Sequence, residues 1–330
     1  MIISQTPYRV SIAGGGTDLP AFYQREYGAV LSLAIDKHMY VTVSPRFDAT
    51  TRVAYTRTEI VSSVDELEHT IVREALRMTG LGPHLEITTV GDVPAGTGLG
   101  SSSSLTVGLL NALYAYQGRV TSHARLADEA CQIEIDVLNK PIGKQDQYAA
   151  AFGGVNYICF HPDGVVDVEP VPCTSDTISE LKRYVLMIYT GQERSADEIL
   201  KRQTAGTKER MDILREMRDL AGQLRESLTG KPEIEEFARL MHAGWELKRS
   251  LGFGITTGQV DEMYASARAA GAIGGKLLGA GGGGFLLLMA PPSRHDAIRS
   301  ALKRPKELDF GVDRRGSRLI FVSDHQRLIQ

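Results

Sequence analysis

The sequence lacks three features that would classify it at once: an excess of basic residues, paired cysteines and a long apolar run. Its formal net charge is −3 and no basic run is present, so nucleic acid and anionic membranes would not be attracted to it electrostatically. Cys131, Cys159 and Cys173 are odd in number and form no CxxC pair. This argues against a disulfide scaffold and against a structural zinc site.

Membrane-spanning and secretory signals are also missing. The longest obvious apolar run, residues 285–290, is far shorter than the roughly 20 residues that cross a bilayer. The stretch MIISQTPYRV has no charged segment followed by an apolar one, so no signal peptide is expected. We therefore predict a cytoplasmic protein that binds small molecules but neither nucleic acid nor a membrane, and the sequence leaves a homodimer open.

Glycine, by contrast, is abundant. The chain has 34 glycines in 330 residues, which exceeds the usual share of about 7% and directs attention to where they gather. Three clusters lie at residues 14–16, at alternate positions over residues 96–100, and over residues 279–284. Each cluster adjoins an apolar, strand-like segment, which distinguishes it from a flexible linker. This pattern indicates backbone that approaches a ligand closely.

The hydrophobic pattern predicts two halves, each of mixed helix and strand. Ser195 and Glu198 have the spacing of a capping box, and a charged helical stretch follows them. We place the boundary near residues 188–194 and predict two domains, residues 1–190 and 191–330, with the ligand between them. The expected strands cover residues 8–13, 40–44, 85–90, 153–160, 184–189, 273–278, 285–289 and 318–323, and the expected helices cover residues 102–116, 123–138, 211–228 and 259–269, with another beginning at Pro232.

The second glycine cluster has the character of a phosphate-binding loop. Its alternate glycines let the backbone turn amides toward an anion, and the helix that follows adds N–H groups and the positive end of its dipole. It is neither a Walker A loop nor a GxGxxG turn. A glycine-rich turn before a serine-capped helix is the alternative, and it explains so dense a pattern less well. The predicted nucleotide-binding residues are Pro94, Gly96, Thr97, Gly98, Leu99, Gly100, Ser101, Ser102, Ser103 and Ser104.

Three motifs, in order along the chain, resemble those of the GHMP kinase superfamily, named for galactokinase, homoserine, mevalonate and phosphomevalonate kinases. Residues 94–104 resemble its second motif, residues 7–18 (PYRVSIAGGGTD) its first, and residues 276–285 (KLLGAGGGGF) its third. The resemblance spans nearly the whole chain. It implies ATP as co-substrate and an α+β fold, with an N-terminal β-α-β domain like that of a ribosomal protein and a ferredoxin-like C-terminal domain.

The resemblance also implies roles in phosphoryl transfer. Galactokinase-like members carry their catalytic base in a Gly-x-x-Asp-Gln pattern, which implies Asp146 as the base, and Arg9 matches a first-motif cation that stabilises negative charge. Glu134 matches the metal-binding glutamate, so Mg²⁺ is assigned to Glu134 and Ser102. Asp136 is the rival ligand, although on a helix it would point roughly 200° away from Glu134. Taken alone, each of these side chains also fits a surface or capping role.

The first motif departs from that of galactokinase, which usually reads Gly-Glu-His-Thr-Asp. Gly15 and Gly16 stand in place of two sugar-reading side chains, whereas Asp18 is retained, so galactose is not the expected substrate. The strings GGGTDLPAFY, AIDK and GQERS are similar to those of D-glycero-D-manno-heptose 7-phosphate kinases and, less closely, of fucokinases. The implied reaction phosphorylates the anomeric C1 hydroxyl and gives the 1,7-bisphosphate, on the route to GDP-heptose and surface polysaccharide.

A phosphorylated sugar also needs cations for its distal phosphate, and the candidates are Lys37, Lys144, Arg194 and Lys201. Two alternatives stay open. One is a fucokinase or another sugar 1-kinase of the superfamily, and the other is a non-catalytic sugar and ATP sensor, which the presence of both base and metal ligand disfavours. The predicted substrate-binding residues are Gly15, Gly16, Thr17, Asp18, Lys144, Arg194, Gly281 and Gly282.

Overall fold

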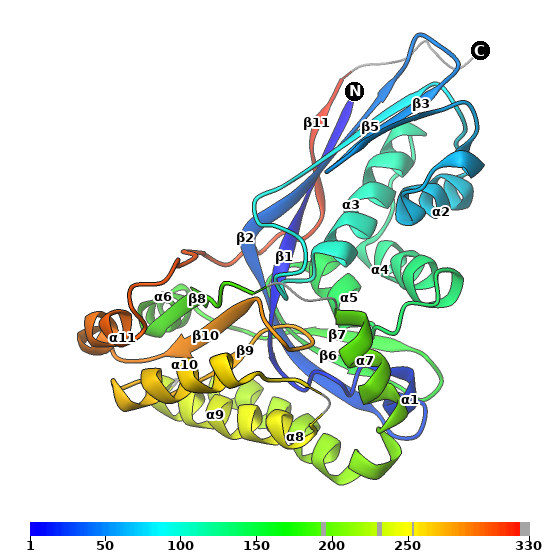
Figure 1. Cartoon of the computed structure of the whole chain (residues 1–330). Helices are drawn as coiled ribbons and strands as arrows, with labels where there is room; N and C mark the ends of the chain where they lie inside the picture. The colour runs from blue at the N-terminus through cyan, green and yellow to red at the C-terminus, as the bar shows by residue number, and fades with distance from the viewer. Residues whose placement is uncertain (193–195, 230–232, 253, 324–330) are drawn as a thin grey trace.

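The computed structural model describes residues 1–192, 196–229, 233–252 and 254–323, which form two packed parts, each a sheet covered by helices (Figure 1). Within these ranges the larger sheet has eight strands and the smaller has three. The α+β class expected for the chain is confirmed. No helix within the same ranges is long and apolar enough to cross a membrane.

The larger sheet is built on two long antiparallel strands, β1 (Ile2–Ala13) and β2 (Gly28–Pro45). Their register shifts between Pro7 and Tyr8, at a proline that cannot donate an amide to the ladder. On its other edge, β2 pairs with β6 (Val155–Phe160) near its start and with β5 (Leu85–Gly91) near its end. The remaining strands are β3 (Thr51–Ala54), β4 (Thr58–Val61), β7 (Val166–Pro170) and β11 (Arg318–Val322), and the main order is β11-β1-β2-β5-β3-β4.

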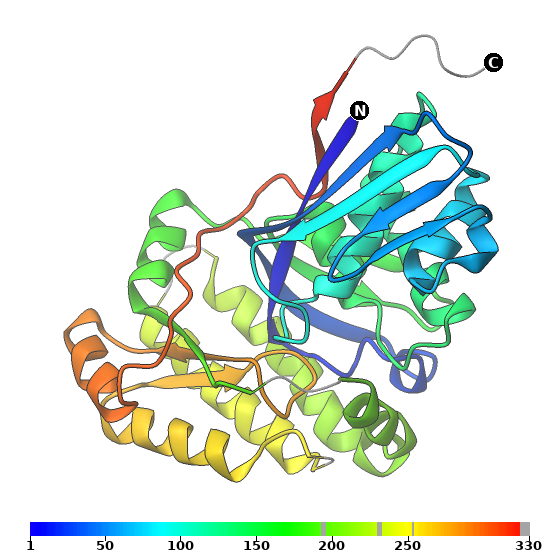
Figure 2. The same ribbon diagram turned by 45° about the horizontal axis from the view of Figure 1, so that its top comes forward.

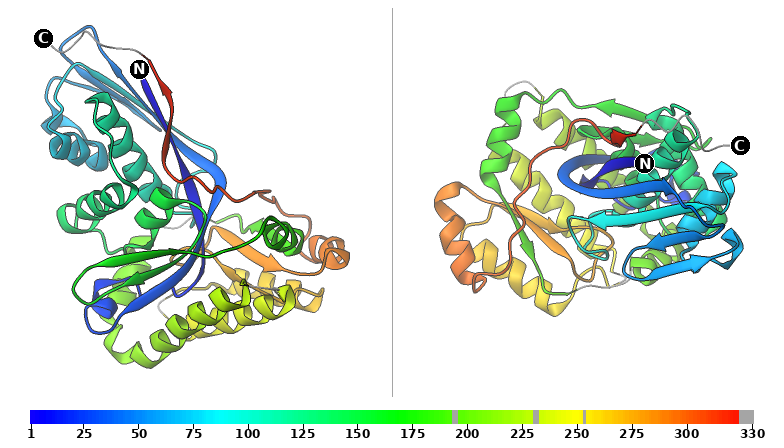
Figure 3. Two further views of the ribbon diagram at one scale, coloured as in Figure 1. Left: turned by 180° about the vertical axis from the view of Figure 1, so that it is seen from behind. Right: turned by 90° about the horizontal axis from the view of Figure 1, so that it is seen from above.

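Helices cover one face of this sheet (Figures 1 and 3). α3 (Ser101–Tyr116) is innermost and is buried nearly all round, because it packs between the strands and the other helices. Gly108 lets α3 approach β1, since an added Cβ would stand 2.7 Å from Thr6 Oγ1. The other helices of this layer are α2 (Thr70–Thr79), α4 (His123–Cys131) and α5 (Gln145–Phe152).

The smaller sheet has the antiparallel order β8 (Val185–Tyr189), β10 (Phe285–Met289), β9 (Gly274–Leu277). α9 (Ile234–Ser250) and α10 (Gly258–Ala269) lie along it (Figure 1), and α8 (Met211–Ser227) packs between α9 and strand β2 of the larger sheet. Every residue of β9 and β10 is buried, so the loop between them is carried on a rigid core. The shorter helices are α1 (Pro20–Tyr23), α6 (Ser175–Tyr184), α7 (Ala196–Ala205) and α11 (His295–Ala301).

The two sheets exchange strands across the expected domain boundary. β8, from residues expected in the first domain, is an edge strand of the smaller sheet. After α11 the chain runs back to the larger part (Figure 2), where β11, from residues expected in the second domain, pairs with β1. The division into residues 1–190 and 191–330 stays a prediction.

Some elements differ from those that the sequence predicts. The helix expected over residues 123–138 ends as α4 at Cys131 and continues as a π-helical turn, Gln132–Val137. β2 begins at Gly28 instead of Tyr40, because its first half is buried on both faces and therefore lacks the alternation that marks a strand. The expected helix starts at Ser195 and Pro232 lie outside the described residues.

Candidate active site

A cavity of about 210 Å³ lies where the two parts meet. Its lining comes from β1 and the turn after it, the loop before α3, the turn before α5, α7, α9 and the loop between β9 and β10 (Figures 1 and 2). All three glycine clusters thus contribute to one cavity. The predicted residues that line it are Arg9, Gly15, Gly16, Asp18, Gly96, Gly98, Gly100, Ser101, Ser102, Ser103 and Asp146.

The loop before α3 faces the cavity with backbone and hydroxyl groups. Gly98 and Gly100 have φ angles of 84° and 76°, in the left-handed region that favours glycine. A Cβ on Gly98 would stand 2.6 Å from the Leu278 carbonyl oxygen, so this residue also permits contact with the β9–β10 loop. No side chain among the described residues caps the first turn of α3, which begins at Ser101. Uncapped amides and the helix dipole favour an anion here.

Four predicted loop residues do not line the cavity but hold the loop in place. Leu99 is buried, and its carbonyl accepts a 3.1 Å hydrogen bond from the Arg9 amide. Thr97 Oγ1 donates to the Pro94 carbonyl at 2.9 Å, and Ser104 Oγ donates to the carbonyl of Pro7 at 2.8 Å. These bonds tie the loop to itself and to β1.

Arg9 and Asp146 form a bidentate ion pair at the edge of the phosphate loop. Arg9 Nε and Nη2 each donate to one carboxylate oxygen of Asp146 at 2.7 Å, and Arg9 Nη1 donates to the Gly98 carbonyl at 2.6 Å. The Arg9 side chain is 5% exposed, whereas that of Asp146, in the first turn of α5, is 24% exposed. The carboxylate is therefore fixed in orientation and still open to the cavity.

Glu134 lies behind Ser102, outside the cavity lining. Ser102 Oγ donates a short hydrogen bond to Glu134 Oε1, and Gln147 Nε2 donates to Glu134 Oε2 at 2.9 Å. Lys140 Nζ lies 3.1 Å from Glu134 Oε1 and 2.8 Å from Ser102 Oγ. The π-helical turn buries Glu134 completely and leaves Asp136 exposed, so Asp136 lies away from this group.

The Ser102–Glu134 pair fits a magnesium ion. Mg²⁺ is usually held by one or two protein oxygens together with substrate phosphates, and here a hydroxyl and a carboxylate oxygen adjoin the phosphate loop. The ammonium of Lys140 contacts both oxygens, so the position already favours positive charge. In the part of the chain that the structure describes, no group of three or more His, Cys, Asp or Glu side chains could hold a metal ion, so substrate phosphates would have to supply further ligands.

The first glycine turn forms the opposite side of the cavity. Asp18 is 3% exposed, and its carboxylate accepts hydrogen bonds from the Gly16 amide at 2.8 Å and from Gln145 Nε2 at 3.0 Å. Burial raises the pKa of Asp18 above its usual value, and the nearby charge of Asp146 raises it further. Thr17 does not line the cavity. Its hydroxyl stabilises the turn by donating a hydrogen bond to the Gly14 carbonyl at 2.8 Å.

α7 closes this side with residues that the sequence does not predict: Asp197, Leu200 and Gln203. Gln203 is 3% exposed, and its amide nitrogen has no hydrogen-bond partner among the described residues. A Cβ on Gly16 would stand 2.2 Å from this nitrogen, so Gln203 occupies the space that Gly16 leaves open. Gln203 does not belong to any motif. The one sequence feature that could have pointed to it is the glycine at position 16, which leaves space for a side chain from another segment.

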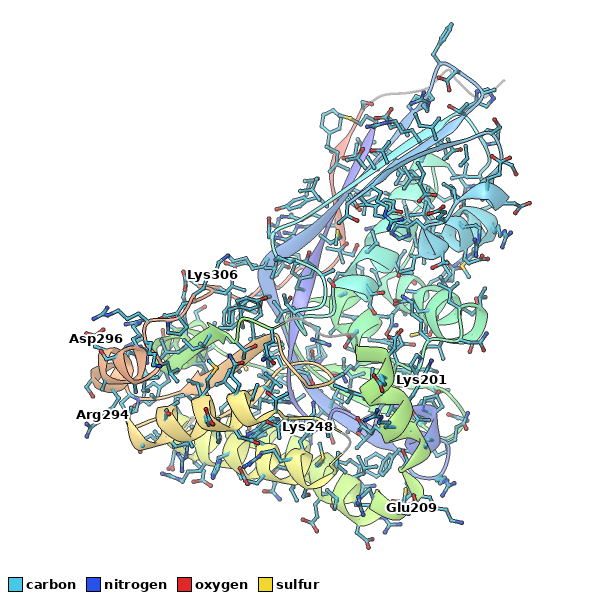
Figure 4. The ribbon with its side chains drawn as sticks, in the orientation of Figure 1. Lys201, Glu209, Lys248, Arg294, Asp296 and Lys306 are labelled. Atoms are coloured by element: carbon cyan, nitrogen blue, oxygen red, sulfur yellow. The ribbon has the colours of Figure 1, made fainter. Side chains whose placement is uncertain are left out.

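Three of the four cations expected to bind a distal phosphate, Lys37, Lys144 and Lys201, are absent from the lining. Lys144 Nζ donates to the Gly164 carbonyl at 3.0 Å, and Lys37 lies 3.4 Å from its neighbour Asp36. Lys201 is exposed on α7 (Figure 4). Arg194 lies outside the described residues. Gly281 and Gly282 also stay outside the lining, packed against Ile255.

Two lysines that the sequence does not predict do line the cavity, Lys140 and Lys248. Lys248 comes from α9 (Figure 4), is 6% exposed, and donates from Nζ to the Gly279 carbonyl at 2.6 Å. Lys248 could have been noticed in the sequence, because it continues the apolar stripe of α9 that contains Met241 and Trp245. A lysine at such a position is predicted to be a buried charged side chain.

Comparison with known proteins identifies the family. The family model for the GHMP kinases N terminal domain matches residues 66–154, and the model for the GHMP kinases C terminal domain matches residues 207–307. A relative from Campylobacter jejuni, named D-glycero-alpha-D-manno-heptose 7-phosphate kinase, is 28% identical and covers 96% of this chain and 97% of its own. A bifunctional fucokinase/GDP-fucose pyrophosphorylase from Arabidopsis thaliana is 26% identical over 93% of this chain and 32% of its own length.

Solved structures agree with this result. The crystal structure of a D-glycero-D-manno-heptose 1-phosphate kinase from Bacteroides thetaiotaomicron has a TM-score of 0.81 and 27% identity, and the match covers 98% of this chain and all of that one. Lactococcus lactis galactokinase shares the fold, with a TM-score of 0.75 at 18% identity and coverage of 96% and 94%. The two family models together match more than half of the chain, and the expected GHMP kinase fold is confirmed. This chain belongs to the GHMP kinases and is an ATP-dependent kinase of that family.

Proposed function

We propose that this protein transfers the γ-phosphoryl group of ATP to the anomeric C1 hydroxyl of D-glycero-D-manno-heptose 7-phosphate, giving the 1,7-bisphosphate for GDP-heptose and surface polysaccharide synthesis. One observation carries the proposal: the Asp146 carboxylate, held by Arg9, lies between the phosphate loop and the turn that contains Asp18. A terminal phosphate and an acceptor hydroxyl would meet there. The names of the relatives from Campylobacter jejuni and Bacteroides thetaiotaomicron support a heptose phosphate as the sugar.

Asp146 is the general base in this reaction. It accepts the proton of the C1 hydroxyl while that oxygen attacks the γ-phosphorus, and the bond from the γ-phosphorus to its bridging oxygen breaks to leave ADP. Arg9 holds both carboxylate oxygens, so the base is oriented before the acceptor arrives. Because Arg9 also binds the Gly98 carbonyl, the base and the phosphate loop are fixed relative to each other.

Ser102 and Glu134 would hold Mg²⁺ together with phosphate oxygens of ATP. Bound there, the ion neutralises charge on the phosphates. The protein keeps the two ligands in place, since Gln147 binds the second oxygen of Glu134 and Lys140 contacts both ligands. The amides of the α3 N-terminus, with the hydroxyls of Ser101 and Ser103, complete the phosphate side of the cavity.

The acceptor side suits a ligand with many hydroxyl groups. Asp18, Gln145 and Gln203 bring a carboxylate and two amides to one side of the cavity, where an isoprenoid alcohol would leave Gln145 Oε1 and Gln203 Nε2 without a partner. The distal phosphate would lie at the rim of the cavity, near the predicted cations. Two of them, Lys144 and Lys201, directly follow lining residues in the sequence, Gly143 and Leu200.

A second candidate function is phosphorylation of a free sugar, as in a fucokinase. One observation favours it: the described lining residues on the acceptor side, such as Gly16, Asp18 and Gln203, carry no positive charge. Relatives named as fucokinases, from Arabidopsis thaliana and Bacteroides fragilis, match most of this chain and about a third of their own lengths.

The deciding experiment compares acceptors at fixed ATP and Mg²⁺. We expect heptose 7-phosphate to exceed free heptose, fucose, mannose and galactose in kcat/KM by about 10- to 150-fold, the range that one charge-assisted hydrogen bond to the distal phosphate supplies. Phosphorus NMR of the product should place the new phosphate on C1. A kcat/KM for fucose or mannose equal to that for the heptose phosphate would favour the second candidate. Nucleotide binding without turnover of any acceptor would instead indicate a sensor.

A further inference from the structure

We propose that Lys248 is a phosphoryl-binding residue of this active site, whose ammonium group contacts the phosphoryl group that leaves ATP. Lys248 lies in the last turn of α9, in the smaller part of the molecule, beneath the loop that joins β9 and β10 (Figure 4). The residue lines the cavity. The inference rests on the kinase chemistry of the proposed function and is independent of which sugar accepts the phosphate.

Lys248 is a buried charge with too few partners. Burial lowers its pKa to about 8, so the side chain still carries its proton at neutral pH. An ammonium group has three N–H donors, and the Gly279 carbonyl is its single acceptor among the described residues. A buried charge that lacks an ion partner is unfavourable. An anionic oxygen entering the cavity would supply the missing partner.

The other two cations of the cavity are already paired. Arg9 is held by both oxygens of Asp146, and Lys140 is held by Glu134. Lys248 forms no ion pair within the described part of the chain. Of the described cations that line the cavity, it is therefore the one whose charge is left for a ligand.

The position of Lys248 matches the transferring phosphoryl group. Its partner Gly279 packs directly on the phosphate loop, because an added Cβ on Gly279 would stand 2.6 Å from Gly98 Cα. The Gly98 carbonyl in turn binds Arg9, the partner of Asp146. The charges near Lys248 include those of Arg9, Asp18 and Asp146, and the buried Lys276 is also close enough to interact with it. Lys248 thus lines the same cavity as the proposed base Asp146 and the acceptor residue Asp18, beside the loop that would hold the phosphates.

Lys276 shows how a buried lysine with a structural role differs. Its Nζ donates to two carbonyls of β1, those of Ser11 at 2.7 Å and Ile12 at 3.0 Å. It ties the smaller sheet to the larger one and does not line the cavity. Lys276→Met is therefore a matched control for the loss of a buried lysine.

The test compares nucleotides that differ only in the γ-phosphate. We would measure the Kd of ADP and of the β,γ-imido analogue of ATP by calorimetry, in Mg²⁺, for wild type, Lys248→Met, Lys248→Gln and Lys248→Arg. We expect both uncharged variants to lose about 10- to 150-fold in affinity for the analogue, the range of one charge-assisted hydrogen bond, with ADP affinity unchanged. In the uncharged variants kcat should fall together with the affinity for the analogue. Lys248→Arg should recover part of the lost affinity and part of the lost kcat.

Three outcomes would overturn the proposal. Equal losses for ADP and the analogue would indicate a structural role through Gly279, as would a loss in Lys248→Met that Lys248→Gln restores. A rise confined to the KM of the phosphorylated sugar would place Lys248 at the distal phosphate.

The control variant Lys276→Met should lower Tm without changing the ratio of the Kd of ADP to that of the ATP analogue. Nucleotide binding is measured without an acceptor, so the result does not depend on whether heptose 7-phosphate is the true substrate. A wild-type protein that binds neither nucleotide would contradict the kinase function itself.

Discussion

The nucleotide side and the acceptor side of the cavity are built differently. On the nucleotide side, Arg9 is paired with Asp146, and Glu134 with Ser102 and Lys140, so these side chains hold one another. On the acceptor side, two glycines contribute no side chains, and the buried amide nitrogen of Gln203 has no partner within the described residues. Apart from Lys248, the side chains of the first side are therefore set before a ligand arrives, and the second side leaves polar groups for the ligand to satisfy.

This difference predicts which kinetic constant a substitution on each side should change. A residue of the nucleotide side acts on the reacting groups, so its loss should lower kcat or weaken nucleotide and metal binding. A residue of the acceptor side should mainly change the KM of the sugar. A substitution on one side that changes the kinetic constants expected for the other side would show that the two sides are coupled.

The largest effect is expected for Asp146→Asn. The variant keeps the size of the side chain but removes the proton acceptor, so kcat should fall by about 10²-fold or more while nucleotide affinity stays nearly unchanged. Single-turnover kinetics and ADP binding would measure the two quantities. Asp176→Asn is the matched control, because Asp176 occupies the same place in the first turn of α6 and is exposed. Near-normal turnover in Asp146→Asn would remove this residue from the mechanism.

The next effect tests how tightly the nucleotide side is set. Gly98→Ala places a Cβ against the Leu278 carbonyl at a φ of 84°, whereas Gly118→Ala, at a φ of 71°, meets no atom within 4 Å. Both should lose about 1–2 kcal/mol of unfolding free energy to the left-handed backbone. Gly98→Ala should lose about 1–3 kcal/mol more from the clash, and its KM for ATP should rise. Equal urea midpoints for the two variants would mean that the glycine loops are not in firm contact.

The same contrast explains what the sequence could and could not predict. Arg9, Ser102 and Asp146 lie within or beside motifs that resemble those of the GHMP kinases, so the resemblance could select them from the sequence, and the structure brings them to one cavity. Gln203 comes from a helix with no motif and reaches Gly16 only through the tertiary fold. Contacts between such distant segments leave no local pattern, so the sequence predicts Gly15, Gly16 and Asp18 on this side of the cavity but not Gln203.

The fold follows the same rule. The buried α3 and β10 are strongly apolar, and both could be predicted from the sequence. The return of β11 to the edge beside β1 could not, because strand pairing across the whole chain depends on the assembled core. The buried Lys248 is an intermediate case, since its place on an apolar stripe is visible but its orientation toward the cavity is not.

A smaller effect is expected for Glu134→Gln. The amide keeps the shape of the side chain but removes a charged ligand, so the Mg²⁺ concentration for half-maximal rate should rise by about tenfold, the scale on which metal sites respond to the loss of one supporting group. Titration of the rate with Mg²⁺ measures this. Asp136→Asn, which changes the exposed rival carboxylate, should leave the titration unchanged. The reverse result would assign the metal to Asp136.

The smallest effect is expected for Gln203→Leu, on the acceptor side. Leucine preserves the volume beside Gly16 but offers no amide, so the KM of the sugar should rise by about 2- to 12-fold, the equivalent of one net hydrogen bond. The KM of ATP should not change, because Gln203 lies on the side of the cavity away from the Ser102–Glu134 pair. Gln223→Leu, at an exposed position of α8, controls for the added apolar surface. A fall in kcat with an unchanged sugar KM would contradict the division between the two sides, because a residue of the acceptor side would then act on the reacting groups.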